Sequence, residues 1–181
     1  MTADNYYSTN TNQFIIETEH PGWQEYLCVF DNALERSEYP DRIQYSIDPN
    51  FQLDITNWID KKLKQHLNYG INIKPHEAWA IEYKDGGYQA FHCHGVDAIT
   101  VVFHFDGQPR IKYAPDSTYG MLYSIMPRAD GTQRLQNHIP TRGKCLIMDG
   151  KVFHGVYPVK EPRRSIVIDF DYNWLDPDEK L

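Results

Sequence analysis

The chain has 181 residues, of which 41% are hydrophobic and 24% are charged, and its formal net charge is −7 at pH 7. This length and composition fit a globular domain with a buried core rather than a disordered chain. No apolar run approaches the roughly 18 residues that span a bilayer, and no signal-like segment opens the chain. We therefore expect a cytoplasmic protein that does not use a membrane, and the negative charge argues against nucleic acid as a partner.

The three cysteines, Cys28, Cys93 and Cys145, are widely spaced and odd in number. This spacing indicates neither a disulfide framework nor the paired cysteines of a zinc knuckle. Reduced thiols are therefore expected.

The first part of the chain is expected to be helical after a polar start. Residues 1–13 have little apolar content, so we expect a flexible arm or one that lies over the surface, followed by a single domain over residues 14–181. Residues 22–36 and 53–70 carry apolar side chains at helical spacing. Two helices are therefore predicted, each with one apolar face to pack on a sheet.

From Glu77 onward the pattern changes to short β-like runs separated by Gly, Pro and Asp. The predicted strands are residues 77–83, 98–105, 110–114, 121–126, 144–150, 152–159 and 165–172. Helices followed by strands, without βαβ alternation, predict a mainly β fold, a barrel or sandwich with the N-terminal helices on one outer face. The connection over residues 124–144 is long for a loop between strands, so we expect it to cover a site.

Three histidines indicate a metal site. His92 and His94 stand two residues apart in the segment YKDGGYQAFHCHG, and His154 lies in a distant FHG segment. Side chains at i and i+2 of a strand point to the same face, so the first two imidazoles would share one opening. A third imidazole would complete a facial set and leave other positions on a metal open, as in catalytic sites. The alternative is a chance HxH pair among eight histidines.

Two arginines open the last predicted strand. By strand alternation Arg163, Ser165 and Asp169 share one face, which suits a polar barrel interior, whereas Arg164 shares the apolar face. A buried arginine can bind a carboxylate through a charge-assisted pair. We expect Arg163, with Ser165 beside it, to be the carboxylate site, and Arg164 is the alternative. Two solvated arginines at a sheet edge remain the non-functional interpretation.

The order of these motifs resembles a known family. A Tyr-x-x-Gly element before HxH, a distal HGV-x-PV and an Arg-x-Ser that opens a last apolar strand fall within residues 78–172. They look like the 2-oxoglutarate- and Fe(II)-dependent oxygenases of the double-stranded β-helix fold, a jelly roll similar to that of cupins. Most members carry an acidic residue where His94 stands. A phage and marine-bacterial group of this superfamily shows HxH, and FHCHGVDAITVVFHF is similar to that pattern.

This resemblance implies a dioxygenase of hydroxylase type. The three histidines would hold Fe(II), 2-oxoglutarate would chelate the iron, and the distal carboxylate would lie on Arg163 with Ser165 and Tyr83 beside it. O₂ would take the last position, 2-oxoglutarate would become succinate, and a small molecule or a protein side chain would be oxidised. If His94 is not a ligand, Asp97 is a nearby carboxylate, although it lies on the opposite strand face.

Three other functions compete with this one. A three-histidine thiol dioxygenase of the cupin class fits the positions of Gly86 and Gly143, but it leaves the Arg-x-Ser strand without a role. Three histidines could also hold zinc at a hydrolytic site. The third alternative is a binding module without turnover. Turnover of 2-oxoglutarate separates the oxygenase from all three.

Overall fold

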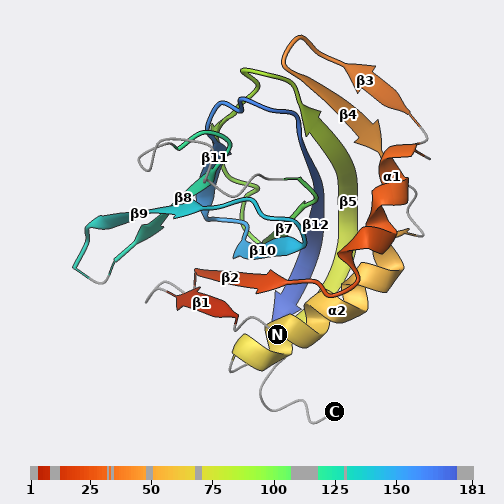
Figure 1. Ribbon diagram of the computed structural model, residues 1–181. Helices are drawn as coiled ribbons and strands as arrows, with labels where there is room; N and C mark the ends of the chain where they lie inside the picture. Colours follow the sequence, from red (N-terminus) through yellow and green to blue (C-terminus); the bar gives the residue numbers. More distant parts are fainter. Residues whose placement is uncertain are drawn as a thin grey trace.

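Two antiparallel sheets face each other, and the helices lie on the outer side of the larger one (Figure 1). This computed structural model describes residues 4–8, 13–31, 33, 35–47, 51–67, 71–106, 118–128 and 130–174. A layer of side chains between the sheets contains both apolar packing and the pocket described below. The two sheets together form the jelly roll expected for a double-stranded β-helix.

The larger sheet has eight strands in the order β1-β2-β10-β7-β12-β5-β4-β3. Their bounds, in that order, are Asn5–Ser8, Phe14–Glu19, Lys144–Asp149, Ala98–His104, Arg163–Trp174, Ile71–Tyr83, Arg42–Ser46 and Arg36–Glu38. The smaller sheet has the order β6-β11-β8-β9. Its strands are Gln89–His92, Phe153–Val156, Leu122–Pro127 and Gln133–His138. Consecutive strands are often not neighbours, which is typical of a jelly roll.

Helix α2, Phe51–His66, covers the outer face of the larger sheet, and the short helices η1, Trp23–Leu27, and α1, Cys28–Asp31, extend this layer (Figure 1). Ile55, Ile59 and Leu63 form its fully buried stripe, at the spacing that places side chains on one helix face. They belong to the same core cluster as Ile168 of β12. The prediction of N-terminal helices on one outer face is therefore confirmed.

Strand β12 organises the face that lines the pocket. It pairs with β5 on one side, where Arg163 lies opposite Tyr83, and with β7 on the other, where Ser165 lies opposite His104. Directly opposed residues of antiparallel strands point to the same side of the sheet. Pairing on both sides therefore brings residues from three strands onto one surface between the sheets.

Several sequence predictions need correction. The predicted strands at residues 77–83, 98–105, 121–126, 144–150 and 165–172 correspond to β5, β7, β8, β10 and β12. The predicted strand at 152–159 is shorter than expected, because β11 spans only Phe153–Val156, and residues 110–114 lie outside the described residues. The first part of the chain also contributes β1 to β4, because these segments complete the hydrogen bonds of the larger sheet. The predicted helix at residues 22–36 is shorter than expected, ending at Asp31. Residues 124–144 are not one long loop, because β8 and β9 pair as a hairpin there.

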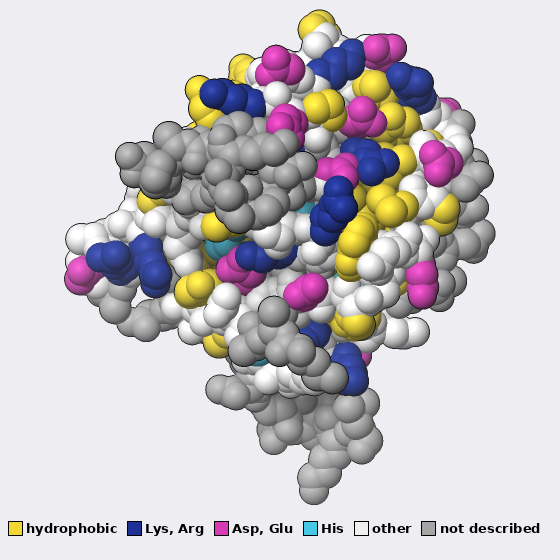
Figure 2. All heavy atoms as spheres, viewed as in Figure 1, with side chains coloured by type: hydrophobic (Ala, Val, Ile, Leu, Met, Phe, Trp, Pro, Cys, Tyr) yellow, Lys and Arg dark blue, Asp and Glu magenta, His cyan; other side chains and the backbone are white. Residues whose placement is uncertain are grey.

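Charged side chains of both signs are interspersed over the face drawn in Figure 2. Mixed signs keep the long-range field of such a surface weak. Among the described helices, none is long and apolar enough to cross a membrane.

A buried polar network joins the two sheets. Lys144 of β10 donates to Glu17 of β2, and Nδ1 of His138 on β9 lies 3.7 Å from the same carboxylate. The Nε2 atom of His138 lies 2.9 Å from the hydroxyl of Ser124 on β8. His138 and Lys144 hold the pKa of Glu17 at about 2, below its ordinary 4.5. The ionised carboxylate therefore stabilises the fold.

We expect Glu17→Gln to lower the free energy of unfolding by on the order of 2 kcal/mol at pH 7. Because the folded pKa is depressed, this contribution is complete above about pH 4.5 and is lost as the pH falls towards about 2. Urea unfolding at several pH values measures it. Glu161→Gln, at an exposed position, is the control and should change little. Equal losses in both variants, or a Glu17→Gln loss that persists at pH 2, would contradict this assignment.

Candidate active site

The three predicted histidines meet between the sheets. His92 at the end of β6 lies directly opposite His154 of β11, so strand pairing alone places these two side by side. His94 follows in the loop to β7, where its backbone N–H donates to the carbonyl of Gly150. One ligand atom from each histidine lies within 4.8 Å of the others. The cluster therefore has the spacing of a metal site.

Each imidazole is held through its Nδ1 atom. The Nδ1 atom of His92 lies 2.7 Å from the carbonyl of Ala90, and that of His154 lies 3.0 Å from the carbonyl of Val152. The Nδ1 atom of His94 lies 2.7 Å from a carboxylate oxygen of Asp169. These partners are all acceptors, so Nδ1 donates in each case and the Nε2 lone pair is left free to bind a metal.

Two of the histidines, His92 and His154, are in the protonation state that binds a metal. Burial lowers the pKa of His92, and it lowers the pKa of His154 to about 3. Both are therefore neutral at pH 7. Nε2 of His94 is buried and has no hydrogen-bond partner among the described residues. Because a buried polar atom without a partner is unfavourable, this orphaned nitrogen fits a site that receives a metal ion.

A buried cation lies in the same pocket. Arg163 is 3% exposed, and burial lowers its pKa to about 10, so that it stays charged at pH 7. It donates to the carbonyl of Gly120, and Nη2 lies 3.2 Å from Nδ1 of His104. Within the described residues its Nε has no partner and no carboxylate pairs with it. An uncompensated buried charge costs several kcal/mol, so this position is suited to an anion.

Tyr83 and Ser165 flank this guanidinium. The guanidinium lies 5.7 Å from the centre of the Tyr83 ring, and burial raises the pKa of the Tyr83 hydroxyl, which therefore stays protonated. The Ser165 hydroxyl lies 3.0 Å from Nδ1 of His104. This end of the pocket thus combines one cation with the hydroxyl of Tyr83 as donors that suit a carboxylate, beside the Ser165 hydroxyl.

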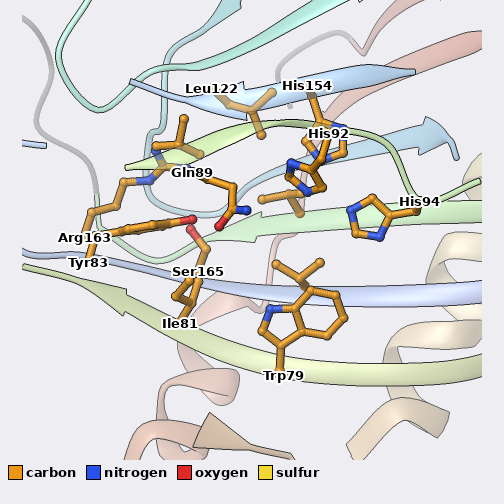
Figure 3. Close-up of a pocket in the computed structure, with 13 residues that line it drawn as sticks. Trp79, Ile81, Tyr83, Gln89, His92, His94, Leu122, His154, Arg163 and Ser165 are labelled. Atoms are coloured by element: carbon orange, nitrogen blue, oxygen red, sulfur yellow. The ribbon is translucent and has the colours of Figure 1, made fainter. Parts of the chain in front are cut away.

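One pocket contains both groups. Figure 3 shows Arg163 and Tyr83 at one end, the histidines at the other, and Gln89 between them. Its walls are mostly apolar and include Ile81, Val102, Leu122, Val156 and Val167. The Trp79 ring lies nearly parallel to that of His94, with centres 6.2 Å apart. The cavity therefore presents a cation at one end and three imidazoles at the other, which suits a small ligand with one carboxylate and a metal-binding end.

The structure separates the sequence candidates. Arg163 and Ser165 line the pocket as predicted, and so does Tyr83. Arg164 faces the other side of β12 and pairs with Asp106, because successive strand residues alternate between the faces. Asp97 is exposed in a turn and does not join the histidine cluster.

Two parts of the site differ from the expectation. His94 lies beyond the end of β6, so it reaches the cluster through the loop rather than by strand alternation with His92. His104, which no sequence motif singled out, contacts both Arg163 and Ser165. The AITVVFHF pattern did place it on a strand, yet alternation along β7 could not show that it lies opposite Ser165.

No protein-family model matches the sequence, and no curated protein matches it. Solved structures do match. A prolyl-4-hydroxylase from Pseudomonas putida has a TM-score of 0.59 and 16% identity, over 87% of this chain and 91% of that one. HygX from Streptomyces hygroscopicus, with nickel, 2-oxoglutarate and hygromycin B bound, has a TM-score of 0.64 and 9% identity, over 87% and 82%.

A third match is an oxidoreductase of the 2OG-Fe(II) oxygenase family from Burkholderia pseudomallei, with a TM-score of 0.63 and 10% identity, over 86% of this chain and 84% of that one. The chain shares the fold of these oxygenases. At such low identity the likeness concerns the fold, and the predicted double-stranded β-helix is confirmed by it.

We expect His154→Ala to abolish stoichiometric binding of a divalent first-row metal, because it removes the most buried of the three nitrogen ligands. Isothermal titration of metal-free protein with Co²⁺ measures the change, and circular dichroism checks that the variant is folded. His76→Ala is the control, because His76 is exposed and outside the cluster. Unchanged Co²⁺ binding by folded His154→Ala would contradict the site.

Proposed function

We propose that this protein is a non-haem Fe(II)- and 2-oxoglutarate-dependent dioxygenase of hydroxylase type. The observation that carries the proposal is the buried Arg163, a cation without a carboxylate partner among the described residues, in the same pocket as three imidazoles spaced to hold a metal. A hydrolytic zinc site needs the histidines but not the arginine. A cosubstrate with a chelating end and a distal carboxylate uses both.

Different residues would bind the iron and the distal carboxylate of the cosubstrate. His92, His94 and His154 would hold Fe(II) through Nε2, since their Nδ1 atoms are already donors. Arg163 would bind the distal carboxylate in a charge-assisted pair, and the hydroxyls of Ser165 and Tyr83 line the same end of the pocket. His104 accepts from the guanidinium and so fixes its direction.

The iron, when bound, would supply the oxidative chemistry: 2-oxoglutarate, O₂ and substrate give succinate, CO₂ and hydroxylated substrate. One oxygen atom of O₂ enters succinate and the other enters the hydroxylated substrate. The protein contributes placement and exclusion of water. Ile81, Val102 and Leu122 surround the space between the two ends with apolar surface. Such walls strengthen the electrostatic interactions inside the pocket and protect the reacting groups from water.

The substrate is proposed only as a class. HygX was solved with hygromycin B, and a Trichoplax adhaerens prolyl hydroxylase with a peptide fragment, so this fold admits small molecules and protein side chains in other proteins. We propose a substrate of one of these two classes, with O₂ as the oxidant. The HxH pattern also supports placement in the phage and marine-bacterial group that the sequence resembles.

Arg163→Met should weaken 2-oxoglutarate binding by at least about 30-fold, because loss of a desolvated charge pair costs about 2 kcal/mol or more. Fe(II) binding should change far less, since the arginine is not a ligand. Anaerobic titration of metal-free protein with Fe(II) and then 2-oxoglutarate measures both, through the visible charge-transfer band of the chelate.

Arg164→Met is the matched control, because that side chain is adjacent in sequence but pairs with Asp106 outside the pocket. It should leave the band and its 2-oxoglutarate dependence unchanged. Iron binding without the band would favour the thiol dioxygenase or the zinc site instead. A folded protein that binds no metal would favour a binding module, and either result would contradict the proposed function.

A further inference from the structure

We infer that Asp169 is the positioning residue of the metal centre, and that its carboxylate supplies behind His94 the negative charge that the three neutral ligands lack. Its carboxylate lies one hydrogen bond from the histidine cluster. The nature of the ion, Fe(II), rests on the proposed function, whereas the effect of Asp169 on metal binding does not.

The contacts of Asp169 are specific. One carboxylate oxygen lies 2.7 Å from Nδ1 of His94, and the other accepts from the hydroxyl of Thr100 at 2.8 Å. Thr100 lies directly opposite Asp169 in the register between β12 and β7. The threonine thus fixes the carboxylate, and the carboxylate fixes the tautomer and direction of the His94 ring. The Trp79 ring lies nearly parallel to the His94 ring, with centres 6.2 Å apart.

The charge of Asp169 has no other evident purpose. Its side chain is 15% exposed and that of His94 is 11% exposed, so the pair is largely removed from water. No lysine or arginine forms an ion pair with Asp169 within the described part of the chain. A carboxylate in such a place is costly unless a cation compensates it. A metal ion on Nε2 of His94 would be that cation.

This arrangement fits the donor set. Iron sites of non-haem oxygenases commonly combine two histidines with one carboxylate, which offsets one charge of the metal. Here all three ligands are imidazoles, and the carboxylate stands behind one of them. Hydrogen bonds of this kind raise the basicity of a ligand, and their loss typically weakens metal binding 10- to 100-fold.

Asp169→Asn tests the inference, because it keeps the size of the side chain and an acceptor oxygen but removes the charge. We expect Co²⁺ to bind about 10- to 100-fold more weakly, measured by isothermal titration of metal-free protein. We also expect the Fe(III)/Fe(II) midpoint potential to become more positive, because the lost negative charge favoured the more highly charged ion. A residue with a merely structural role would not move this potential.

Asp171→Asn is the matched control. It removes the same charge from the same strand, but Asp171 is 63% exposed and its partner is the exposed His76. Its Co²⁺ affinity should stay within about twofold of the unmodified protein, since exposed charges act weakly through water. If Asp171→Asn weakened Co²⁺ binding as much as Asp169→Asn does, the effect would come from net charge alone, and the inference would be overturned.

A double-variant cycle tests the link through His94. In the His94→Asp background a carboxylate faces the metal directly, so Asp169→Asn should no longer weaken Co²⁺ binding. Equal losses in both backgrounds would overturn the inference. Asp169→Ser, a smaller polar replacement, gives a second probe if the asparagine variant does not fold. Unchanged Co²⁺ affinity in a folded variant at position 169 would also overturn it.

These measurements are independent of the proposed reaction, because no 2-oxoglutarate is present in the Co²⁺ titration. If 2-oxoglutarate fails to bind while Asp169→Asn still weakens the metal, the proposed function fails and the role of Asp169 stands. If 2-oxoglutarate binds while Asp169→Asn leaves metal binding unchanged, the role of Asp169 fails and the proposed function stands.

Discussion

The register of β12 between β5 and β7 is the constraint on which the site depends. Each residue of β12 on the face towards the pocket lies opposite a residue on a neighbouring strand, and opposed residues share a face. The opposed pairs are Arg163 with Tyr83, Ser165 with His104, Val167 with Trp79, and Asp169 with Thr100. A shift of one residue would turn this whole row towards the helices and bring the apolar row, with Ile168, into the pocket.

The same strand carries two charges of opposite sign that are largely removed from water. Arg163 is a cation that lacks a carboxylate among the described residues, and Asp169 is an anion whose partners there are a histidine and a threonine. Neither is stable alone in an apolar layer, so both are explained by groups that bind from outside. In our proposal a metal beyond His94 would compensate the anion, and a ligand carboxylate would compensate the cation. The proposed cosubstrate joins these two sites in one molecule.

Sequence patterns identified much of this site. Alternation along the last strand correctly separated Arg163 from Arg164, because it depends only on neighbouring residues. The HxH pair and the distant histidine were correctly expected to meet, although His94 reaches the cluster from a loop. The contact of Asp169 with His94 was missed, since the two residues are far apart in the chain. The hairpin of β8 and β9 was missed as well, because the exposed β9 carries few apolar residues to mark it as a strand.

The sequence by itself determined the types of most elements from Glu77 onward, the faces of the residues in the last strand and the residue types available for metal and carboxylate binding. These follow from the two-residue period of a strand and the 3.6-residue period of a helix, which are local properties of the chain. Only the tertiary structure decided which strands are neighbours and in what register. Strand order and register depend on the summed burial and hydrogen bonding of segments distant in sequence. They bring His104 into contact with Arg163, and Asp169 into contact with His94.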